Sequence, residues 1–516
     1  MGEIGFLDLF AGCGGLSLGL EQAGLELVAA VERSPMAAES HFKNFHLRNQ
    51  AWDQPLWDEV LASSSGGSFA KQVHYGTVVG DVWDLLADAE AMSLLKELAP
   101  DVVVGGPPCQ GFSMAGKRDP GDERNALPWA FLRFVDYLDP KAVVIENVVG
   151  INRAFASHGG VEPPFSQLRR ELERTGLERG GPGYLVQPVE VNARHFGVPQ
   201  NRPRMMLIAV RRDLPVASEA EASGAPSDVL WRSVDAFNSL LDGQKPMFGH
   251  RMVPAVGSQV DGDEPNQVHS AMDALGDLDR NGYSLPHDSP RYGTKGLRFA
   301  SQMRGATPRT SRGGWWHWGS LRRRLRTWIR HWLLGQRVRP ANHVPRNHSE
   351  RVIQRFDLYH FFADKGIPNT VLGLPSQFDD LEARQQVADV LGDHANEKPD
   401  RRFTTAEDDD LVDVVMRLAT RKHSQRVVDA KEPAPTVLTL PDDYVHPIEP
   451  RIMTVRELAR FQSFPDWFEF RSKETTGSNR RRFEVPQYSQ VGNAVPPLMA
   501  KAIGLLLAEL LEATRT

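Results

Sequence analysis

Cysteine is nearly absent from this chain of 516 residues, which contains only Cys13 and Cys109. Two cysteines cannot build the disulfide framework of a small secreted protein, so we expect a reducing, cytoplasmic location. No run approaches the ~18 apolar residues of a membrane span, and the first residues lack the charged-then-apolar pattern of a signal peptide. These absences predict a soluble protein with no membrane partner.

An excess of positive charge is also missing, since 60 basic and 66 acidic residues give a net charge of −6. The whole chain is therefore not a polycation that binds nucleic acid without selectivity, although a local basic patch is not excluded. Apolar residues make up 41% of the chain, enough for substantial hydrophobic cores, which excludes intrinsic disorder. The length allows two large domains or about three of ordinary size.

Short apolar runs alternate with helical periods through the first two hundred residues. The candidate strands are 4–10, 26–32, 75–80, 101–105, 142–147, 184–191 and 204–210. Apolar strands separated by helices are typical of a sheet covered on both faces, so we predict a doubly wound α/β fold. Ligands of such folds bind at the carboxyl ends of the strands. An excursion at 48–73, which includes a Ser/Gly run, is predicted to be a flexible loop.

A glycine-rich turn follows the first strand, where Phe10 leads through Ala11, Gly12, Cys13, Gly14 and Gly15 into a predicted helix. Glycines let the backbone turn tightly and approach a ligand beside the positive end of the helix. Such a turn binds NAD, FAD or S-adenosylmethionine, or serves packing alone. Glu32 closes the second strand, where an acid commonly holds ribose hydroxyls, and Asp81 follows the third. Either acid could equally be an ordinary strand-end or helix-cap residue.

A second turn presents a cysteine after the fourth strand, in the run Gly106-Pro107-Pro108-Cys109. The two prolines fix their φ angles and remove two N–H donors, so this loop is stiff and non-helical. A thiol held in this way suits a nucleophile, although a lone cysteine is more often a small buried hydrophobe. The loop and the glycine-rich turn end strands of the same predicted sheet, which favours the nucleophile.

A carboxyl and two arginines complete the candidate site. Glu146 ends the fifth strand, where a poorly solvated carboxyl can donate a proton near neutral pH. The alternative is a structural carboxylate paired with an arginine. Arg202 and Arg204 begin a later strand, and their spacing of two predicts the same face. They could orient an anionic or carbonyl-bearing substrate or neutralise Glu146.

These segments, in this order, resemble the motifs of the cytosine-C5 DNA methyltransferase family. FLDLFAGCGGLSLGLEQAG is similar to its cofactor loop, VVVGGPPCQGFS to its nucleophile loop, IENV to its glutamate motif and QNRPR to its arginine motif. RIMTVRELARFQSFPD and QVGNAVPP resemble its last two motifs. The resemblance covers about 1–212 and 435–516. It implies a doubly wound mixed α/β sheet, Rossmann-like as in S-adenosylmethionine-dependent methyltransferases, with a second, mixed target-recognition domain.

The resemblance also implies the chemistry. Cys109 would add to C6 of a cytosine flipped out of double-stranded DNA while Glu146 holds a proton at N3, and C5 would then accept the methyl group of S-adenosylmethionine. Arg204, with Arg202, would hold the cytosine carbonyl and Glu146. The implied cofactor pocket consists of Phe10, Gly12, Cys13, Gly14, Gly15, Glu32, Asp81, Pro108 and Asn493.

The implied domain boundaries place a catalytic and cofactor-binding domain at 1–212 and a target-recognition domain at 213–445. Residues 446–516 would form a hinge helix and a return to the first domain, with helices at 454–462 and 496–513. Within the middle region, 301–349 holds eleven arginines, no lysine, no acid and five interleaved tryptophans. This stretch suits a DNA-facing surface, because arginines bind phosphates and guanine edges and aromatic rings stack or wedge. The alternative is buried tryptophans with a solvated arginine rim.

The resemblance sets the biological expectations too. We expect a bacterial enzyme of restriction–modification or phage defence, monomeric on DNA, nucleoid-associated, with possible restriction or defence partner proteins. Three alternatives stay open: an RNA cytosine-C5 methyltransferase, a catalytically inactive DNA-binding paralogue, and a small-molecule methyltransferase. The long middle region argues against the RNA enzyme, and the intact cysteine, glutamate and glycine motifs argue against the inactive paralogue. The third would not need the PCQ loop or so large a second domain.

Overall fold

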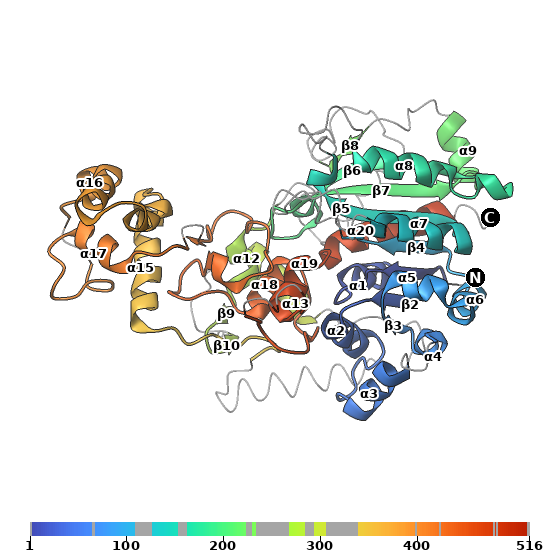
Figure 1. Cartoon of the computed structure of the whole chain (residues 1–516), viewed down its shortest axis with the longest axis horizontal. Helices are drawn as coiled ribbons and strands as arrows, with labels where there is room; N and C mark the ends of the chain where they lie inside the picture. Colours follow the sequence, from blue (N-terminus) through green and yellow to red (C-terminus); the bar gives the residue numbers. More distant parts are fainter. Residues whose placement is uncertain are drawn as a thin grey trace.

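The computed structural model combines a wide central sheet with a helical extension (Figure 1). It describes residues 3–63, 68–108, 126–152, 163–222, 230–233, 268–283, 294–305, 339–397, 400–422, 425–477, 480 and 483–512. Within this part of the chain no single helix is long and apolar enough to cross a membrane. Helices α19 (Gln487–Asn493) and α20 (Pro497–Glu512) pass that test only together, as a pair bent by 42°.

The central sheet has eight strands in the order β3-β2-β1-β4-β5-β7-β6-β8. Its strands are β1 (Gly5–Leu9), β2 (Glu26–Glu32), β3 (Thr77–Val79), β4 (Val102–Gly105), β5 (Ala142–Val148), β6 (Tyr184–Asn192), β7 (Pro203–Arg211) and β8 (Trp231–Arg232). The first five strands are parallel to one another, whereas β7 runs antiparallel to both β5 and β6. All seven predicted strands and the mixed α/β class are confirmed, and β8 was not predicted.

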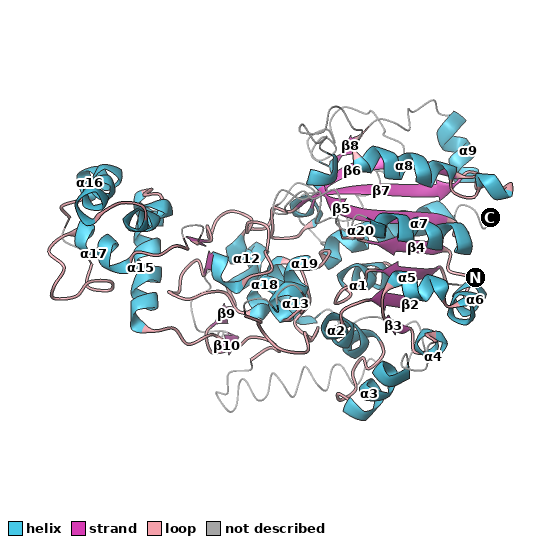
Figure 2. Cartoon of the chain, in the orientation of Figure 1, coloured by secondary structure: helices cyan, strands magenta, loops and turns pink. Residues whose placement is uncertain are grey.

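Helices cover both faces of the sheet (Figure 2). One face carries α1 (Gly15–Gln22), α9 (Pro215–Ala222) and α20, and the other carries α5 (Val82–Ala87), α6 (Ala89–Glu97), α7 (Leu127–Leu138) and α8 (Pro164–Arg174). Successive strand residues serve opposite cores: Val102 and Val104 pack toward α20, and Val103 packs toward α7. This alternation follows from the two-residue period of a strand and explains why the strands are apolar throughout.

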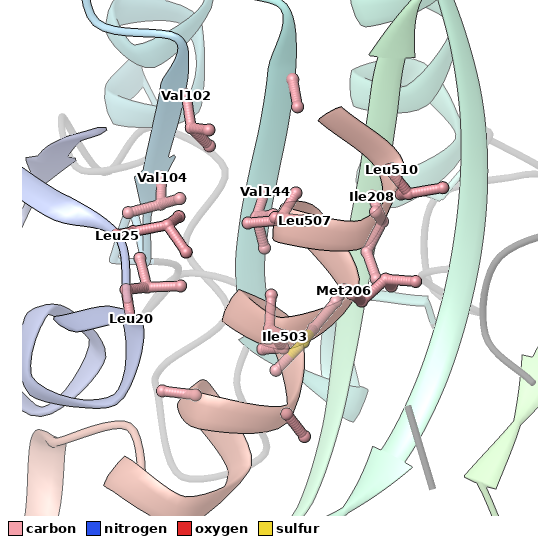
Figure 3. Packing of buried hydrophobic residues seen from close by; sticks show 14 of the residues in the cluster. Leu20, Leu25, Val102, Val104, Val144, Met206, Ile208, Ile503, Leu507 and Leu510 are labelled. Carbon is pink, nitrogen blue, oxygen red and sulfur yellow. The ribbon is translucent and has the colours of Figure 1, made fainter. Parts of the chain in front are cut away.

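The core under α20 joins the end of the chain to its beginning. Ile503, Leu507 and Leu510 of this helix point at Val144 and Ile208 of the sheet (Figure 3). A close helix contact supports the arrangement, because a Cβ added at Gly19 of α1 would lie 2.3 Å from the Cβ of Ala500. Helix α20 is thus part of the core on one face of the central sheet.

The prediction of a flexible loop at 48–73 is wrong. Helices α3 (Gln54–Ser63) and α4 (Ala70–His74) lie there, next to α2 (Pro35–Phe45). Trp57 and Val60 are buried in a small core with Phe42, and the Trp57 and Phe42 ring centroids are 5.3 Å apart. The Ser/Gly run suggested a linker, but Trp57 and Val60 before it pack against α2, and Val73 after it is buried in the core on one face of the sheet.

The rest of the chain forms two further groups of elements. The first comprises α12 (Ala271–Leu275), β9 (Leu278–Asp279), β10 (Gly282–Tyr283), α13 (Thr294–Gly305), α18 (Val455–Phe461) and α19. The second, which we call the helical lobe, comprises α15 (Glu350–Lys365), the 3₁₀ helix η7 (Asn369–Ser376), α16 (Asp380–Leu391) and α17 (Leu411–Leu418). Strands β11 (Arg426–Val427) and β12 (Tyr444–Val445) pair in parallel beside this lobe.

The helical lobe has its own hydrophobic core and lies at the opposite end of the molecule from the sheet (Figure 1). The first group shares one core with Cys13 and Leu18 of the glycine-rich turn and α1. That core includes residues on both sides of the expected boundary at 445, so the domain boundaries stay predictions. Most of the Arg/Trp-rich stretch, 306–338, lies outside the described residues.

Candidate active site

The glycine-rich turn has a left-handed backbone at three positions. The φ angles are 60° at Phe10, 59° at Gly12 and 97° at Gly14, so two of the three positions suit glycine far better than other residues. A Cβ added at Gly15 would meet the Val495 carbonyl oxygen at 2.2 Å, which explains a third glycine by close packing. A Cβ added at Gly12 would meet nothing within 4 Å. Gly12 therefore borders open space, the one feature here that packing does not explain.

Glu32 contacts the glycine-rich turn from the end of β2, and Asp81 follows β3, the next strand of the sheet. Glu32 accepts hydrogen bonds from the backbone N–H of Gly12 at 2.9 Å and of Ser34 at 2.7 Å, and burial raises the pKa of its carboxyl. Asp81 caps α5 by accepting from the N–H of Trp83 at 2.9 Å and lies 3.5 Å from the Arg33 guanidinium. The two acids and the turn thus follow three adjacent strands of the sheet at their carboxyl ends.

The other residues expected to line the cofactor pocket differ in burial and in their contacts. The Cys13 thiol is buried, its Sγ donates to the Gln490 carbonyl at 3.7 Å, and burial raises its pKa. This side chain faces the C-terminal segment, so only the Cys13 backbone can line the open space. Asn493 is exposed at the end of α19, and Pro108 is half-buried. Cys109 lies outside the described residues.

Glu146 and Arg204 form an ion pair between neighbouring antiparallel strands. The Arg204 Nε lies 2.7 Å from Glu146 Oε1, and both side chains are nearly buried, at 10% and 13% exposure. The carboxylate also packs against the loop after β4, because a Cβ added at Gly106 would come within 2.9 Å of Glu146 Oε2. Glu146 is therefore held between a guanidinium and the residues that lead directly to Cys109.

A comparison with models of protein families identifies the family of this chain. Residues 4–59 and 71–508 match the model of the C-5 cytosine-specific DNA methylase family. The chain belongs to this family. It is a DNA (cytosine-5-)-methyltransferase, and its resemblance to this family is confirmed.

Curated relatives support the same enzyme class. Type II methyltransferase M.XorII of Xanthomonas oryzae is 27% identical over 500 residues, which cover 96% of this chain and 83% of the relative. M.AgeI of Thalassovita gelatinovora is 27% identical over 524 residues, covering 96% and 97%. M.HgiDI of Herpetosiphon aurantiacus is 35% identical over 205 residues, covering 40% and 52%. The methyltransferase thus has restriction–modification enzymes among its relatives.

Arg202 of the methyltransferase has a different set of partners from Arg204. It is buried just before β7, and its guanidinium donates to three backbone carbonyls: Val437 at 3.2 Å, Gly492 at 2.9 Å and Ala494 at 3.1 Å. Arg202 and Arg204 are both buried and Pro203 between them is exposed, but the hydrogen-bond partners of Arg202 lie in the C-terminal half of the chain. These contacts favour a positioning role for Arg202, which docks the segment around Asn493 onto the sheet.

Asn147 is a site residue of the methyltransferase that sequence reasoning missed. Its Nδ2 donates to the Pro107 carbonyl at 3.2 Å, and its Oδ1 accepts from the N–H of Val148 at 2.8 Å. Asn147 thus ties the strand that carries Glu146 to the loop that leads to Cys109. The signal was its place inside the IENV motif, directly after the glutamate, where a buried amide needs partners.

Proposed function

We propose that this DNA (cytosine-5-)-methyltransferase transfers a methyl group from S-adenosylmethionine to C5 of a cytosine extruded from double-stranded DNA, through a covalent bond between Cys109 and C6. The observation that carries the proposal is the 2.7 Å ion pair of Arg204 and Glu146, held against Gly106. This pair lies near the carboxyl end of β5. The neighbouring strand β4 ends at the same side of the sheet, and from there the chain continues through two prolines to Cys109. The glycine-rich turn ends β1, the immediate neighbour of β4 in the same sheet.

The residues around Gly12 would hold the adenosine part of the cofactor. Adjacent strand ends supply an acid for ribose hydroxyls, Glu32, and an acid for the adenine amine, Asp81. Phe10 would stack on adenine, and the backbone from Gly12 to Gly15, with Pro108 and Asn493, would complete the pocket. The bound cofactor supplies an electrophilic methyl group on a sulfonium.

The residues of the chain would make C5 of cytosine reactive. The Cys109 thiolate adds its electron pair to C6, while Glu146, as the protonated acid, gives its proton to N3, so that C5 becomes an enamine carbon. Arg204 holds the glutamate in position and contacts the cytosine carbonyl. After methylation, N3 returns its proton to Glu146, the C5 proton passes to water, and elimination of the thiolate restores the aromatic ring and frees Cys109.

Extrusion of the base costs a few kcal/mol, which contacts to phosphates and to the pocket must offset. Residues 213–445 are the region that would read the surrounding sequence. The type II relatives favour a restriction–modification role, with phage defence as a related setting. A bacterial, cytoplasmic and nucleoid-associated enzyme that binds DNA as a monomer, with a nuclease or defence protein as partner, is the setting we infer.

The test is the Cys109→Ser variant. We expect it to lose methyl transfer to DNA while it retains S-adenosylmethionine binding, because the thiol reacts with the base and does not hold the cofactor. Incorporation of tritiated methyl groups measures the first property, and calorimetry measures the second. Cys13→Ala serves as the control, since a DNA duplex with 5-fluorocytosine should still trap that variant covalently. Methyl transfer at the wild-type rate by Cys109→Ser would refute the role of the thiol.

A further inference from the structure

A cavity of about 460 Å³ opens between the helical lobe and the β11–β12 pair. It is lined by Asn369 and Thr370 of η7, Gln425 and Arg426 at β11, and Asp443 and Tyr444 at β12. A seventh residue, Leu438, belongs to the loop that approaches the active site. Six of these seven residues carry a polar group, and the cavity is built from η7, the β11–β12 pair and the loop between those two strands.

The chain connects this cavity to the active site over a short distance. Val437 accepts a hydrogen bond from Arg202, and Gly492 packs so closely on Leu438 that a Cβ there would lie 2.4 Å from the Leu438 oxygen. From Val437 to Asp443 is six residues, which span at most about 20 Å. Six base pairs at ~3.4 Å each cover the same length. Asp443 therefore lies within about 20 Å of the backbone that Arg202 binds, and Arg202 is two residues before Arg204, the partner of Glu146.

Rigid neighbours hold the polar groups of the cavity. Arg426 pairs directly with Tyr444 in the β11–β12 ladder, and its guanidinium carbon lies 5.7 Å from the centre of the tyrosine ring. Gln425 is buried and donates to the Asp442 carbonyl at 2.5 Å, and Asn369 donates to the Gln425 carbonyl at 3.1 Å. A side chain on such a supported strand can present its donors in one direction.

At the cavity, Arg426 provides hydrogen-bond donors and Asp443 provides hydrogen-bond acceptors. Arg426 is exposed, and its guanidinium interacts with the Tyr444 side chain and has further N–H donors in a planar fork. The Asp443 carboxyl is half-buried: burial raises its pKa and so does Asp442, while Lys422 and Arg426 lower it. Within the described part of the chain, Asp443 has no hydrogen bond or ion pair through its carboxylate. Its oxygens are therefore available as acceptors.

We propose that Arg426 and Asp443 are specificity-determining residues that read a G·C base pair flanking the methylated cytosine, from the major groove. In that groove guanine presents two acceptors, O6 and N7, and its cytosine partner presents the N4 amino donor. An arginine fork matches the guanine edge, and a carboxylate accepts from the cytosine amine. An A·T pair would set its N6 amino donor against the arginine. The inference rests on the proposed function, because it assumes that the cytosine reacts at Glu146.

A phosphate is the competing occupant of the cavity, and Asp443 argues against it. A carboxylate in the same cavity repels an anion, and Asp442 adds a second negative charge next to it. Asp442 itself is engaged by Lys422 at 2.6 Å, so that lysine is not free for a phosphate either. Base recognition uses the donor and the acceptor together, whereas phosphate binding would use only the donor.

The experiment compares methylation patterns in a bacterial host that lacks cytosine methylation. Bisulfite sequencing of the host genome gives the target sequence of the wild-type enzyme and of the Arg426→Ala, Arg426→Lys and Asp443→Ala variants. We expect Arg426→Ala to accept other bases at one G·C position, with discrimination there reduced about 5- to 150-fold. Asp443→Ala should relax the same position or its neighbour. Arg421→Ala is the matched control, an exposed arginine five residues earlier that does not line the cavity.

Each other outcome has a distinct meaning. An unchanged target sequence with uniformly slower methylation in Arg426→Ala would overturn base reading in favour of a phosphate contact. If that variant fails to accumulate, Arg426→Lys decides, because it keeps the charge but loses the fork: undiminished discrimination would overturn the inference. Absence of 5-methylcytosine with the wild-type enzyme would instead refute the proposed function.

Discussion

Replacing Arg202 by lysine should loosen the C-terminal segment from the sheet and leave the chemistry of the active site intact. The buried guanidinium donates to the carbonyls of Val437, Gly492 and Ala494. A lysine ammonium is more compact and can reach one or two of these acceptors. Each carbonyl left without a donor costs about 1–3 kcal/mol, so we expect the free energy of unfolding to fall by about 2–4 kcal/mol.

The measurement is urea unfolding, together with steady-state kinetics. Because Asn493 lies between two of the carbonyls, the Arg202→Lys variant should show a raised KM for S-adenosylmethionine and a nearly unchanged kcat. Arg204→Lys is the control, since Arg204 pairs with Glu146 and its loss should lower kcat instead. Wild-type stability and cofactor KM in Arg202→Lys, with a large fall in kcat, would refute the positioning role and favour the catalytic one.

Two further predictions concern the glycine-rich turn and the strand β1 before it. Gly15→Ala should lower the free energy of unfolding by about 1–3 kcal/mol, because its Cβ would overlap the Val495 carbonyl, whereas Gly477→Ala, with open space around it, should have little effect in the same urea assay. Burial raises the pKa of Asp8 to about 7, against about 3.9 in the unfolded chain. The folded state therefore binds this proton more tightly, so the stability that it contributes is complete below pH ~4 and is lost as the pH rises through about 7. Asp8→Asn should remove this loss. The free energy of unfolding of the variant, relative to that of the wild type, should therefore grow by about 3 kcal/mol between pH 5 and pH 8. If the difference in unfolding free energy between the two proteins does not vary with pH, the raised pKa of Asp8 is contradicted.

Local pattern was sufficient for the sheet and for the chemical groups at its edge. The apolar runs predicted seven of the eight strands of the central sheet, because a strand buried on both faces must consist almost entirely of apolar residues. Glycines and prolines predicted the turns, since their backbone limits act within a few residues. The Ser/Gly run at 63–68 misled the same reasoning, because burial of Trp57 against Phe42 depends on a helix elsewhere in the chain.

By itself, the amino-acid sequence determined the order of the motifs, the class of fold and the residue types available for catalysis. Only the tertiary structure distinguished Arg202 from Arg204, since two arginines at the same spacing look alike until their partners are known. Those partners lie on β5 for Arg204 and as far as 292 residues along the chain for Arg202. The position of Arg426 and Asp443 beside one cavity was likewise decided by strand pairing. Hydrogen bonds and burial join residues that are near in space, and a periodicity read along the chain contains no information about such distant contacts.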